Sequence, residues 1–339
     1  MTEKTGIFAE SNESQKPQIN LARSTTSRMW LVSLCAFIAV VQSSLTDYYS
    51  SLLVALGAVS AAVLSEYIIL GSNRGKKALL DGSAVASALI LCLLLPNRIS
   101  PAYAAAGAAF GMAVIKHSFG GLGSNWLNPA AAGWLFIRFS WPASFNEALM
   151  GSPNLNAVFV PPVSADNPLN TILNRTVFSF FGVELPSGYM DLFSSRLPGI
   201  IADRGVFAIL LGTIIITASQ VNRAWIPAIY LAAFSFLFRL AGALPYGAGI
   251  WNGDVLYALC TGGTLVAAFF LAADPATGAK SSGGIFLAVL ASGAIAFLFR
   301  CFGNEPYGAV ITAILINALL PLVRVFESKS LYETQGTPL

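Results

Sequence analysis

Apolar residues gather in ten blocks along the chain, separated by polar stretches or by stretches that contain glycine or proline. A helix needs about 20 mostly apolar residues to cross a bilayer. Several of the blocks are short or interrupted by glycine or proline, which is typical of helices that line a cavity enclosed by protein. The blocks predict membrane-spanning helices at residues 29–44, 50–70, 83–95, 102–115, 126–139, 205–219, 225–243, 255–273, 284–299 and 307–325.

The composition agrees with this pattern. The 339 residues are 55% hydrophobic and only 10% charged, whereas about a quarter of the residues in a soluble domain are charged. So little charge cannot cover a surface that faces water, and we predict an all-α polytopic membrane protein. The net charge of +3 is too small to indicate a nucleic-acid partner. One histidine and four cysteines without C-x-x-C spacing give no sign of a metal or haem site.

A long polar stretch divides the ten blocks into two groups of five. We predict an N-terminal tail at 1–28, a first five-helix half at 29–140, a loop at 141–202, a second five-helix half at 203–325 and a C-terminal tail at 326–339. A half with an odd number of spans ends on the opposite side from where it began. The two halves are therefore expected to be inverted relative to each other.

A short motif supports this repeat. Lys116-His-Ser-Phe-Gly-Gly follows the fourth block and Arg300-Cys-Phe-Gly-Asn follows the ninth. Both contain a Phe-Gly pair, and both precede an Asn- and Pro-containing entry into the next block. The shared position of the motif predicts that the two halves have the same internal order.

The basic residues predict the orientation. With both termini in the cytoplasm, 12 of the 19 Lys and Arg residues fall on the cytoplasmic side, and every cytoplasmic connection carries at least one. Basic residues concentrate in the cytoplasmic loops of membrane proteins, while long loops are translocated largely regardless of charge. We therefore predict a multi-pass membrane protein with both termini in the cytoplasm and the 141–202 loop outside.

The connection between the fourth and fifth blocks is a candidate ligand site. Gly120, Gly121 and Gly123 would let the backbone approach a flat or phosphorylated ligand closely. Asn125 and Asn128 offer amide donors and acceptors beside them. The alternative is that this run is only a tight connection between two spans.

Carboxylates at the ends of the blocks are further candidates. Asp274 either contributes to a site or caps or ends a helix. Asp81 either faces the other half or marks a helix start, where it or Ser83 supplies the N-cap. Glu66 and Asp254 are the remaining acids at or inside the blocks, and an intramembrane carboxylate suggests ion passage or a buried partner. Glu66 alternatively reaches the interface with its charged end.

Five motifs spread over nearly the whole chain carry a family resemblance. They are Asp81-Gly-Ser with Leu93-Leu-Leu-Pro96, Phe119-Gly-Gly-Leu-Gly-Ser-Asn-Trp-Leu-Asn-Pro-Ala130, Gly188-Tyr-Met-Asp-Leu-Phe-Ser-Ser-Arg-Leu-Pro-Gly199, Ala272-Ala-Asp-Pro275, and Gly303-Asn-Glu-Pro-Tyr-Gly308 with Ala313-Ile-Leu-Ile-Asn-Ala318. With these motifs the chain resembles the RnfD/NqrB family, and RnfD more closely. The glycine-rich second motif is the most specific of the five.

The resemblance implies a membrane subunit of an ion-pumping electron-transfer complex. Such complexes link ferredoxin and NAD (Rnf) or NADH and quinone (Nqr), and they move Na⁺ or H⁺. The resemblance also implies ten spans in two inverted halves, other subunits of the complex as partners, and contact with membrane lipid. It implies FMN esterified by a flavin transferase to a threonine of the extracytoplasmic loop, and a second, non-covalent flavin (riboflavin or FMN) near the spans.

The chain departs from the family at the flavin-attachment motif. The family pattern is Ser/Thr-Gly-Ala-Thr, usually followed by Pro-Leu, and the matching run here is Ser164-Ala-Asp-Asn167-Pro-Leu. Asn167 stands where the threonine is expected, and an amide cannot form the phosphoester. The next hydroxyl is that of Thr171, with Thr176 in reserve. Three alternatives stay open: no covalent flavin, FMN on Thr171, or attachment elsewhere.

The function predicted from the sequence is therefore a flavin-carrying electron-transfer subunit of an Rnf-type complex that is not active alone. Three alternatives remain: an Nqr-type protein similar to NqrB, a small-solute channel or transporter with inverted repeats, and a structural subunit without a redox role.

Overall fold

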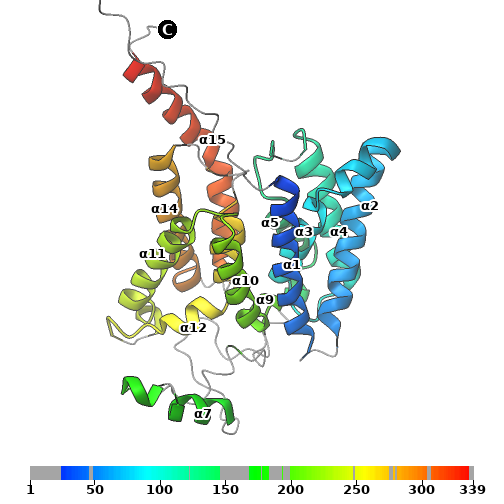
Figure 1. Ribbon diagram of the computed structural model, residues 1–339. Coiled ribbons are helices and arrows are strands. Elements are labelled where there is room, and N and C mark those ends of the chain that lie inside the picture. The colour runs from blue at the N-terminus through cyan, green and yellow to red at the C-terminus, as the bar shows by residue number, and fades with distance from the viewer. Residues whose placement is uncertain are drawn as a thin grey trace, which may run out of the picture.

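Helices form every regular element of the described chain in this computed structural model (Figure 1). Pro96 and Ile200 pair through an isolated bridge and not through a strand. The all-helical prediction is confirmed for the part of the chain that the structure describes. That part consists of residues 24–45, 49–121, 123–145, 168–176, 178–182, 193, 199–246, 249–274, 278, 281–303 and 307–335.

The first group of helices comes from the N-terminal part of the chain. Asn128 and Ser100 each precede a proline at the first helical position of α5 and α4, a position where proline's missing N–H costs nothing. The elements are α1 (Thr25–Ser44), α2 (Ser50–Leu79), α3 (Ser83–Leu94), α4 (Pro101–Phe110), its π-helical extension η1 (Gly111–His117) and α5 (Pro129–Ser140).

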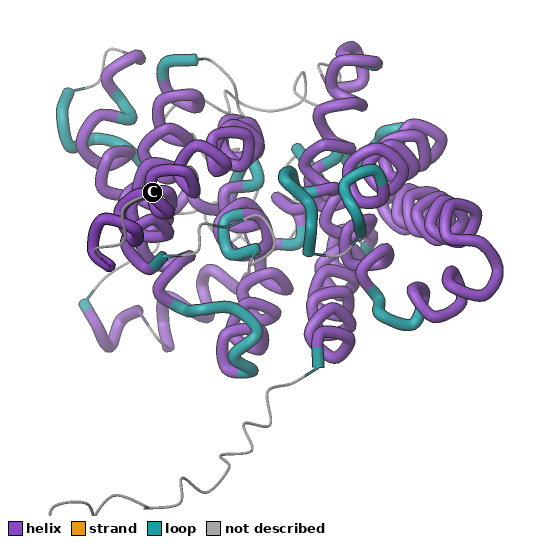
Figure 2. Tube along the Cα trace, turned by 90° about the horizontal axis from the view of Figure 1, so that it is seen from above, coloured by secondary structure: helices purple, strands orange, loops and turns teal. Residues whose placement is uncertain are grey.

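The second group comes from the C-terminal part. Its elements are α9 (Ile201–Arg204), α10 (Val206–Ala218), α11 (Trp225–Ala241), η3 (Leu244–Tyr246), α12 (Val255–Cys260), α13 (Thr264–Val266), the π-helix η4 (Ala267–Leu271), α14 (Ser282–Cys301) and α15 (Gly308–Gln335). Seen from above, the helices gather in two groups (Figure 2). The groups meet where α10 packs on α1 and where α15 contacts α5.

The connection between the groups contains α7 (Pro168–Thr176) and the short η2 (Phe178–Phe181). Figure 1 places α7 apart from both groups, at the opposite end of the molecule from the C-terminal end of α15. That the loop and the C-terminus lie on opposite sides of a membrane stays a prediction.

Three helices within the described ranges are long and apolar enough to cross a bilayer: α1, residues Ser50–Gly71 of α2, and α14. Exposed leucines and an isoleucine line the outward side of α2, where they would face lipid: Leu53, Leu56, Leu64 and Ile68. Shorter apolar helices, such as α3 and α10, accompany these three. A helical membrane protein is therefore supported, whereas the ten spans and their inversion stay predictions.

Glycine allows close helix packing inside the first group. A Cβ added to Gly107 of α4 would lie 2.9 Å from the Gly133 carbonyl oxygen of α5, and one on Gly133 would lie 2.6 Å from the Gly107 oxygen. Small residues that let backbones approach in this way are typical of helix contacts in membranes. The contact brings α5, which begins at Asn128, firmly against α4.

The predicted segment 255–273 is not one continuous helix. It breaks after Cys260, because Gly262 and Gly263 adopt left-handed φ values of 69° and 71°, which glycine tolerates far better than other residues. A short helical turn then begins at Thr264 and continues into η4. Hydropathy alone did not distinguish this interrupted helix from a continuous one.

Candidate functional site

Asn128 holds the start of α5. Its Oδ1 accepts hydrogen bonds from the backbone N–H groups of Ala130 at 2.9 Å and Ala131 at 3.4 Å. These bonds satisfy amides that have no partner within the helix, as an N-cap residue does. Because this oxygen is fixed by the cap, the side-chain NH₂ group of Asn128 is left pointing away from the helix end.

That NH₂ group joins two sequence motifs. Asn128 Nδ2 donates to Asp274 Oδ2 at 2.9 Å across a separation of 146 residues. Asp274 follows η4, so the bond connects the end of the interrupted helix with the start of α5. Sequence reasoning selected both residues as candidates, and the structure brings them into contact.

A cavity of about 220 Å³ lies beside this contact. Asn125, Asn128, Asp274, Ser83 and Lys116 contribute to its lining. Asn125 is only 6% exposed, and its Oδ1 has no hydrogen-bond partner. A buried acceptor without a partner costs free energy, so this amide is suited to bind a donor group of a ligand. Three of the predicted site residues therefore share one cavity.

The three predicted glycines lie elsewhere. Gly120, Gly121 and Gly123 have φ values of 105°, 91° and 88°, and they are absent from the linings of the described cavities. Their left-handed backbone makes the sharp turn that leads from η1 to the loop before α5. This arrangement agrees with the alternative of a tight connection, and a role in ligand binding stays a prediction.

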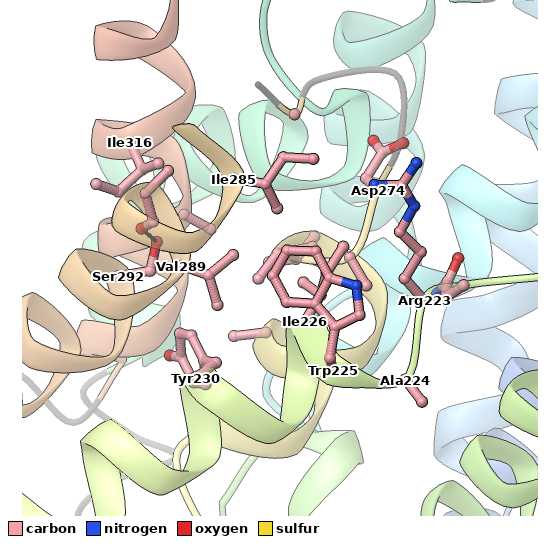
Figure 3. A pocket seen from close by; sticks show the side chains of 18 of the residues that line it. Arg223, Ala224, Trp225, Ile226, Tyr230, Asp274, Ile285, Val289, Ser292 and Ile316 are labelled. Atoms are coloured by element: carbon pink, nitrogen blue, oxygen red, sulfur yellow. Dashed lines mark hydrogen bonds between the residues drawn. The ribbon is translucent and has the colours of Figure 1, made fainter. Parts of the chain in front are cut away.

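A larger cavity of about 720 Å³ adjoins the first, and the two linings have Arg28, Val221, Asn222 and Asp274 in common. Figure 3 shows Arg223 and Asp274 at one side of this cavity, with Tyr230 and Ser292 at the other. Cavities that bind small molecules usually measure about 300–1,000 Å³. The larger cavity falls in this range, and the smaller one falls below it.

The inner wall of the larger cavity carries donors without partners. Tyr230 is 1% exposed and Asn317 is 5% exposed, and neither the Tyr230 hydroxyl nor the Asn317 Nδ2 has a hydrogen-bond partner. Sequence reasoning did not select either residue as a site candidate, although Asn317 falls within the fifth family motif. Asn317 is a polar residue inside an apolar block, and that signal could have identified it.

Glu66 lies inside the first group in contact with Lys116. Lys116 Nζ donates to Glu66 Oε1 at 2.5 Å and to Ser83 Oγ at 2.6 Å. The Lys116 and Glu66 side chains are 3% and 1% exposed, and His117 Nε2 lies 3.5 Å from the same carboxylate oxygen. The alternative that Glu66 extends to the interface is therefore wrong, because its charge is paired within the protein.

Two other acids accept backbone hydrogen bonds at helix starts. Asp81 Oδ1 accepts from the Ser83 N–H at 2.7 Å at the start of α3, and Asp254 Oδ1 accepts from the Tyr257 N–H at 3.1 Å at the start of α12. The N-cap residue of α3 is Gly82, so Asp81 binds the first helical N–H from the residue before the N-cap. Neither acid lines the described cavities.

Thr171 and Thr176 both lie on α7 and both are exposed. The Thr176 hydroxyl donates to the Ile172 carbonyl oxygen at 2.7 Å. Asn167, at the position where the family pattern expects the attachment threonine, lies outside the described residues. Figure 1 places α7, the helix that carries both threonines, apart from both helix groups, and no residue of α7 lines either cavity.

A sequence model of the NQR2, RnfD, RnfE family matches residues 12–333. The chain belongs to this family. It is 28% identical, over 98% of both chains, to the subunit named D of the proton-translocating ferredoxin:NAD(+) oxidoreductase complex of Clostridium ljungdahlii. It is 26% identical, over 94% of both chains, to the subunit of the same name in the Na(+)-translocating ferredoxin:NAD(+) oxidoreductase complex of Acetobacterium woodii.

A third relative is the corresponding subunit, also named D, of the ion-translocating oxidoreductase complex of Vibrio cholerae, at 25% identity over 93% of this chain and 97% of the relative. The resemblance to RnfD is thus confirmed along nearly the full length. Two of the three relatives are named for different ions, so family membership alone does not decide which ion this chain would serve.

Proposed function

We propose that this chain is the RnfD-type membrane subunit of an Rnf-type complex that couples electron transfer between ferredoxin and NAD to ion movement. The names and the full-length match of the relatives support this assignment. Other subunits of the complex would be its partners, and Na⁺ or H⁺ would be the translocated ion. The complex would lie in a bacterial cytoplasmic membrane with both termini of the chain in the cytoplasm.

We further propose that a non-covalent flavin, riboflavin or FMN, binds in the adjoining cavities. The main support for this flavin site is the Asn128–Asp274 contact, which brings two family motifs together. Asp274 lines both cavities, so the contact lies where they adjoin. Asn125, Tyr230 and Asn317 add buried polar atoms without partners, which suit the carbonyl and N–H groups of such a ring. The flavin would supply the redox chemistry, and the protein its binding and shielding from water.

The proposed ten spans in two inverted halves have support in paired local features. Gly82 and Gly263 both adopt a left-handed φ directly before a helix start. A hydroxyl residue follows each, Ser83 or Thr264, and each hydroxyl contacts a buried cation. In both halves this cation, Lys116 or Arg300, lies at the end of the next long helical segment. A repeat requires the same order of features in each half.

A purified complex tests the non-covalent flavin. Tyr230→Phe removes only a hydroxyl without a partner, so the fold should persist while flavin content falls several-fold. Tyr307→Phe is the matched control, since Tyr307 is equally buried but absent from both cavity linings. The measurement is flavin released by acid per complex. Equal flavin in both variants would count against the site, and no released flavin in the unmodified complex would count against the cofactor.

The covalent flavin needs a separate test. FMN esterified to Thr171 would make the denatured chain fluoresce on a gel, and Thr171→Ala should abolish that band while Thr176→Ala leaves it. Both threonines are exposed on the same helix, so they are matched. A chain without fluorescence would support the alternative in which Asn167 marks a loop that carries no covalent flavin. If the fluorescent band were lost only in Thr176→Ala, the attachment residue would be Thr176 and not Thr171.

A further inference from the structure

The break between α12 and α13 exposes backbone groups inside the protein. A helix end leaves its last carbonyl groups without partners in the helix. Here the end of α12 is buried, with Ala258 and Thr261 at 0% and 2% exposure. Buried carbonyl oxygens need a donor or a cation, so something must satisfy them.

Arg300 of α14 satisfies these oxygens together with the Thr264 hydroxyl, which lies 3.1 Å from both the Ala258 and the Thr261 carbonyl oxygen. Arg300 Nη1 donates to the Ala258 carbonyl oxygen at 2.9 Å, to the Thr261 carbonyl oxygen at 2.7 Å and to Thr264 Oγ1 at 3.2 Å. Its Nη2 donates to Thr261 Oγ1. Arg300 is 2% exposed, so its charge is enclosed by two carbonyl and two hydroxyl oxygens. We call this group of four acceptors the oxygen cage.

The other side of the break carries the opposite charge. Asp203 is 3% exposed, and its Oδ1 accepts from the Gly263 N–H at 3.3 Å. Anions are stabilised near the amide end of a helix and cations near its carbonyl end. The break therefore has a cation at its carbonyl end and an anion at its amide end, both from the protein itself.

The first half contains a related arrangement. Gly82 adopts φ 74° at the start of α3, and the next residue, Ser83, accepts from the buried Lys116 at 2.6 Å. A buried cation from the following helical segment thus reaches a hydroxyl beside a left-handed glycine in both halves. The recurrence argues that this placement of charge is a built feature of the fold and not an accident of one side chain.

We propose that Arg300 is a built-in cation, whose guanidinium fills an oxygen cage that would otherwise bind a monovalent metal ion. Interrupted helices of membrane transporters coordinate Na⁺ through unwound backbone carbonyl groups at such breaks. The oxygen cage offers the same ligand chemistry, but a tethered group occupies it. The break in the second half therefore stays closed to the cations of the medium.

Arginine suits this role because its guanidinium stays charged at every physiological pH and spreads several N–H donors over a fixed plane. It can satisfy carbonyl and hydroxyl oxygens at different angles at once. An ammonium group has the charge but concentrates it at one point. The inference does not rest on the proposed flavin, since none of the residues that form the cage or fill it lines either of the two cavities.

Thermal unfolding of the purified complex in different chloride salts tests this proposal. The unmodified chain should have the same Tm in NaCl, in KCl and in the chloride of a large organic cation. Arg300→Ala should lower the Tm by roughly 10 °C in the organic salt, as expected for uncompensated buried groups. About 10 mM guanidinium, too dilute to denature, should restore most of the loss, and Na⁺ or K⁺ should restore part.

Two variants sharpen the test. Arg300→Lys should remain independent of the salt, because its ammonium would occupy the oxygen cage. Arg239→Ala is the matched control, since the exposed Arg239 donates from Nη1 to a single backbone oxygen, that of Gly253, at 3.1 Å. It should show no rescue by guanidinium.

Three outcomes would overturn the proposal. One is an Arg300→Ala variant with no response to guanidinium, sodium or potassium. Another is an unmodified chain whose Tm already depends on Na⁺ or K⁺ to the same degree as that variant. The third is failure to recover folded Arg300→Ala even with guanidinium present throughout purification, because a cage that accepts a free guanidinium should then fold.

Discussion

Lys116 and Glu66 form an ion pair that water hardly reaches, with side-chain exposures of 3% and 1%. Removing one partner of such a pair leaves a buried charge without compensation, which typically costs about 3–5 kcal/mol. Lys116→Met should therefore destabilise the protein by about this amount. The measurement is the Tm of the purified protein, which should fall by roughly 10 °C.

A double variant separates the pair from its surroundings. Lys116→Met combined with Glu66→Gln removes both charges, and replacing a buried pair by neutral groups is often close to neutral. The double variant should therefore be more stable than Lys116→Met alone. A double-mutant cycle built from the two single variants and the double variant should give a coupling free energy well above its experimental error. Additive effects of the two changes would show that the pair does not stabilise the fold.

This pair also shows what sequence reasoning can locate at the scale of a residue. An acid inside an apolar block is visible in the sequence, and Glu66 was selected for that reason. Its partner is 50 residues away, and no local pattern indicates that Lys116 turns inward. The contact of Asp81 was easier to locate from the sequence, because its partner is the N–H of Ser83, only two residues away.

At the scale of an element, the start of α3 depends on the left-handed backbone of Gly82. Its φ is 74°, and an added Cβ would lie 3.0 Å from the Trp30 indole ring. A left-handed conformation costs a residue with a side chain about 1–2 kcal/mol. Gly82→Ala should therefore destabilise the protein by at least this amount, measured as a decrease in Tm.

Gly283→Ala is the matched control within α14. An added Cβ there meets no atom within 4 Å, and its φ is not left-handed. Alanine favours a helix over glycine by up to about 1 kcal/mol, so this change should leave the Tm unchanged or raise it. If both alanine variants lost the same stability, backbone conformation would not be the reason for the effect at Gly82.

The interrupted helix marks the limit of sequence reasoning at this scale. Hydropathy located a span at 255–273 and the helix starts of α3, α5 and α14 within a few residues. The Gly262–Gly263 pair is visible in the sequence, but two glycines also occur at residues 283 and 284 inside the continuous helix α14. What differs is the surroundings, since Arg300 and Asp203 stabilise the ends of the break and make it favourable.

For the whole molecule, the sequence indicated the class of protein and much of one site. The low charge content excluded a soluble protein, and Asn125, Asn128 and Asp274 prove to line one cavity. Tyr230 and Arg223 were not selected, because an aromatic or basic residue near a helix start has many other roles. Only the packing of α11 against α14 and η4 places them around the larger cavity.

The orientation in the membrane is the prediction that belongs to the whole molecule. Both termini in the cytoplasm would place α7 outside and the connection after η1 inside. Thr176 of α7 and Ser118 after η1 are both exposed, so a cysteine introduced at either position should react with a thiol reagent that cannot cross membranes. The four native cysteines are buried, so the thiol reagent should label the unmodified chain only weakly.

In cells whose outer envelope has been made permeable but whose cytoplasmic membrane is intact, Thr176→Cys should be labelled and Ser118→Cys should not. In inverted membrane vesicles the two should exchange behaviour, because each vesicle exposes the cytoplasmic face. Labelling of both variants on the same side would contradict the separation of α7 from the cytoplasmic ends of the helices. A reversed pattern would keep that separation but invert the orientation derived from the basic residues.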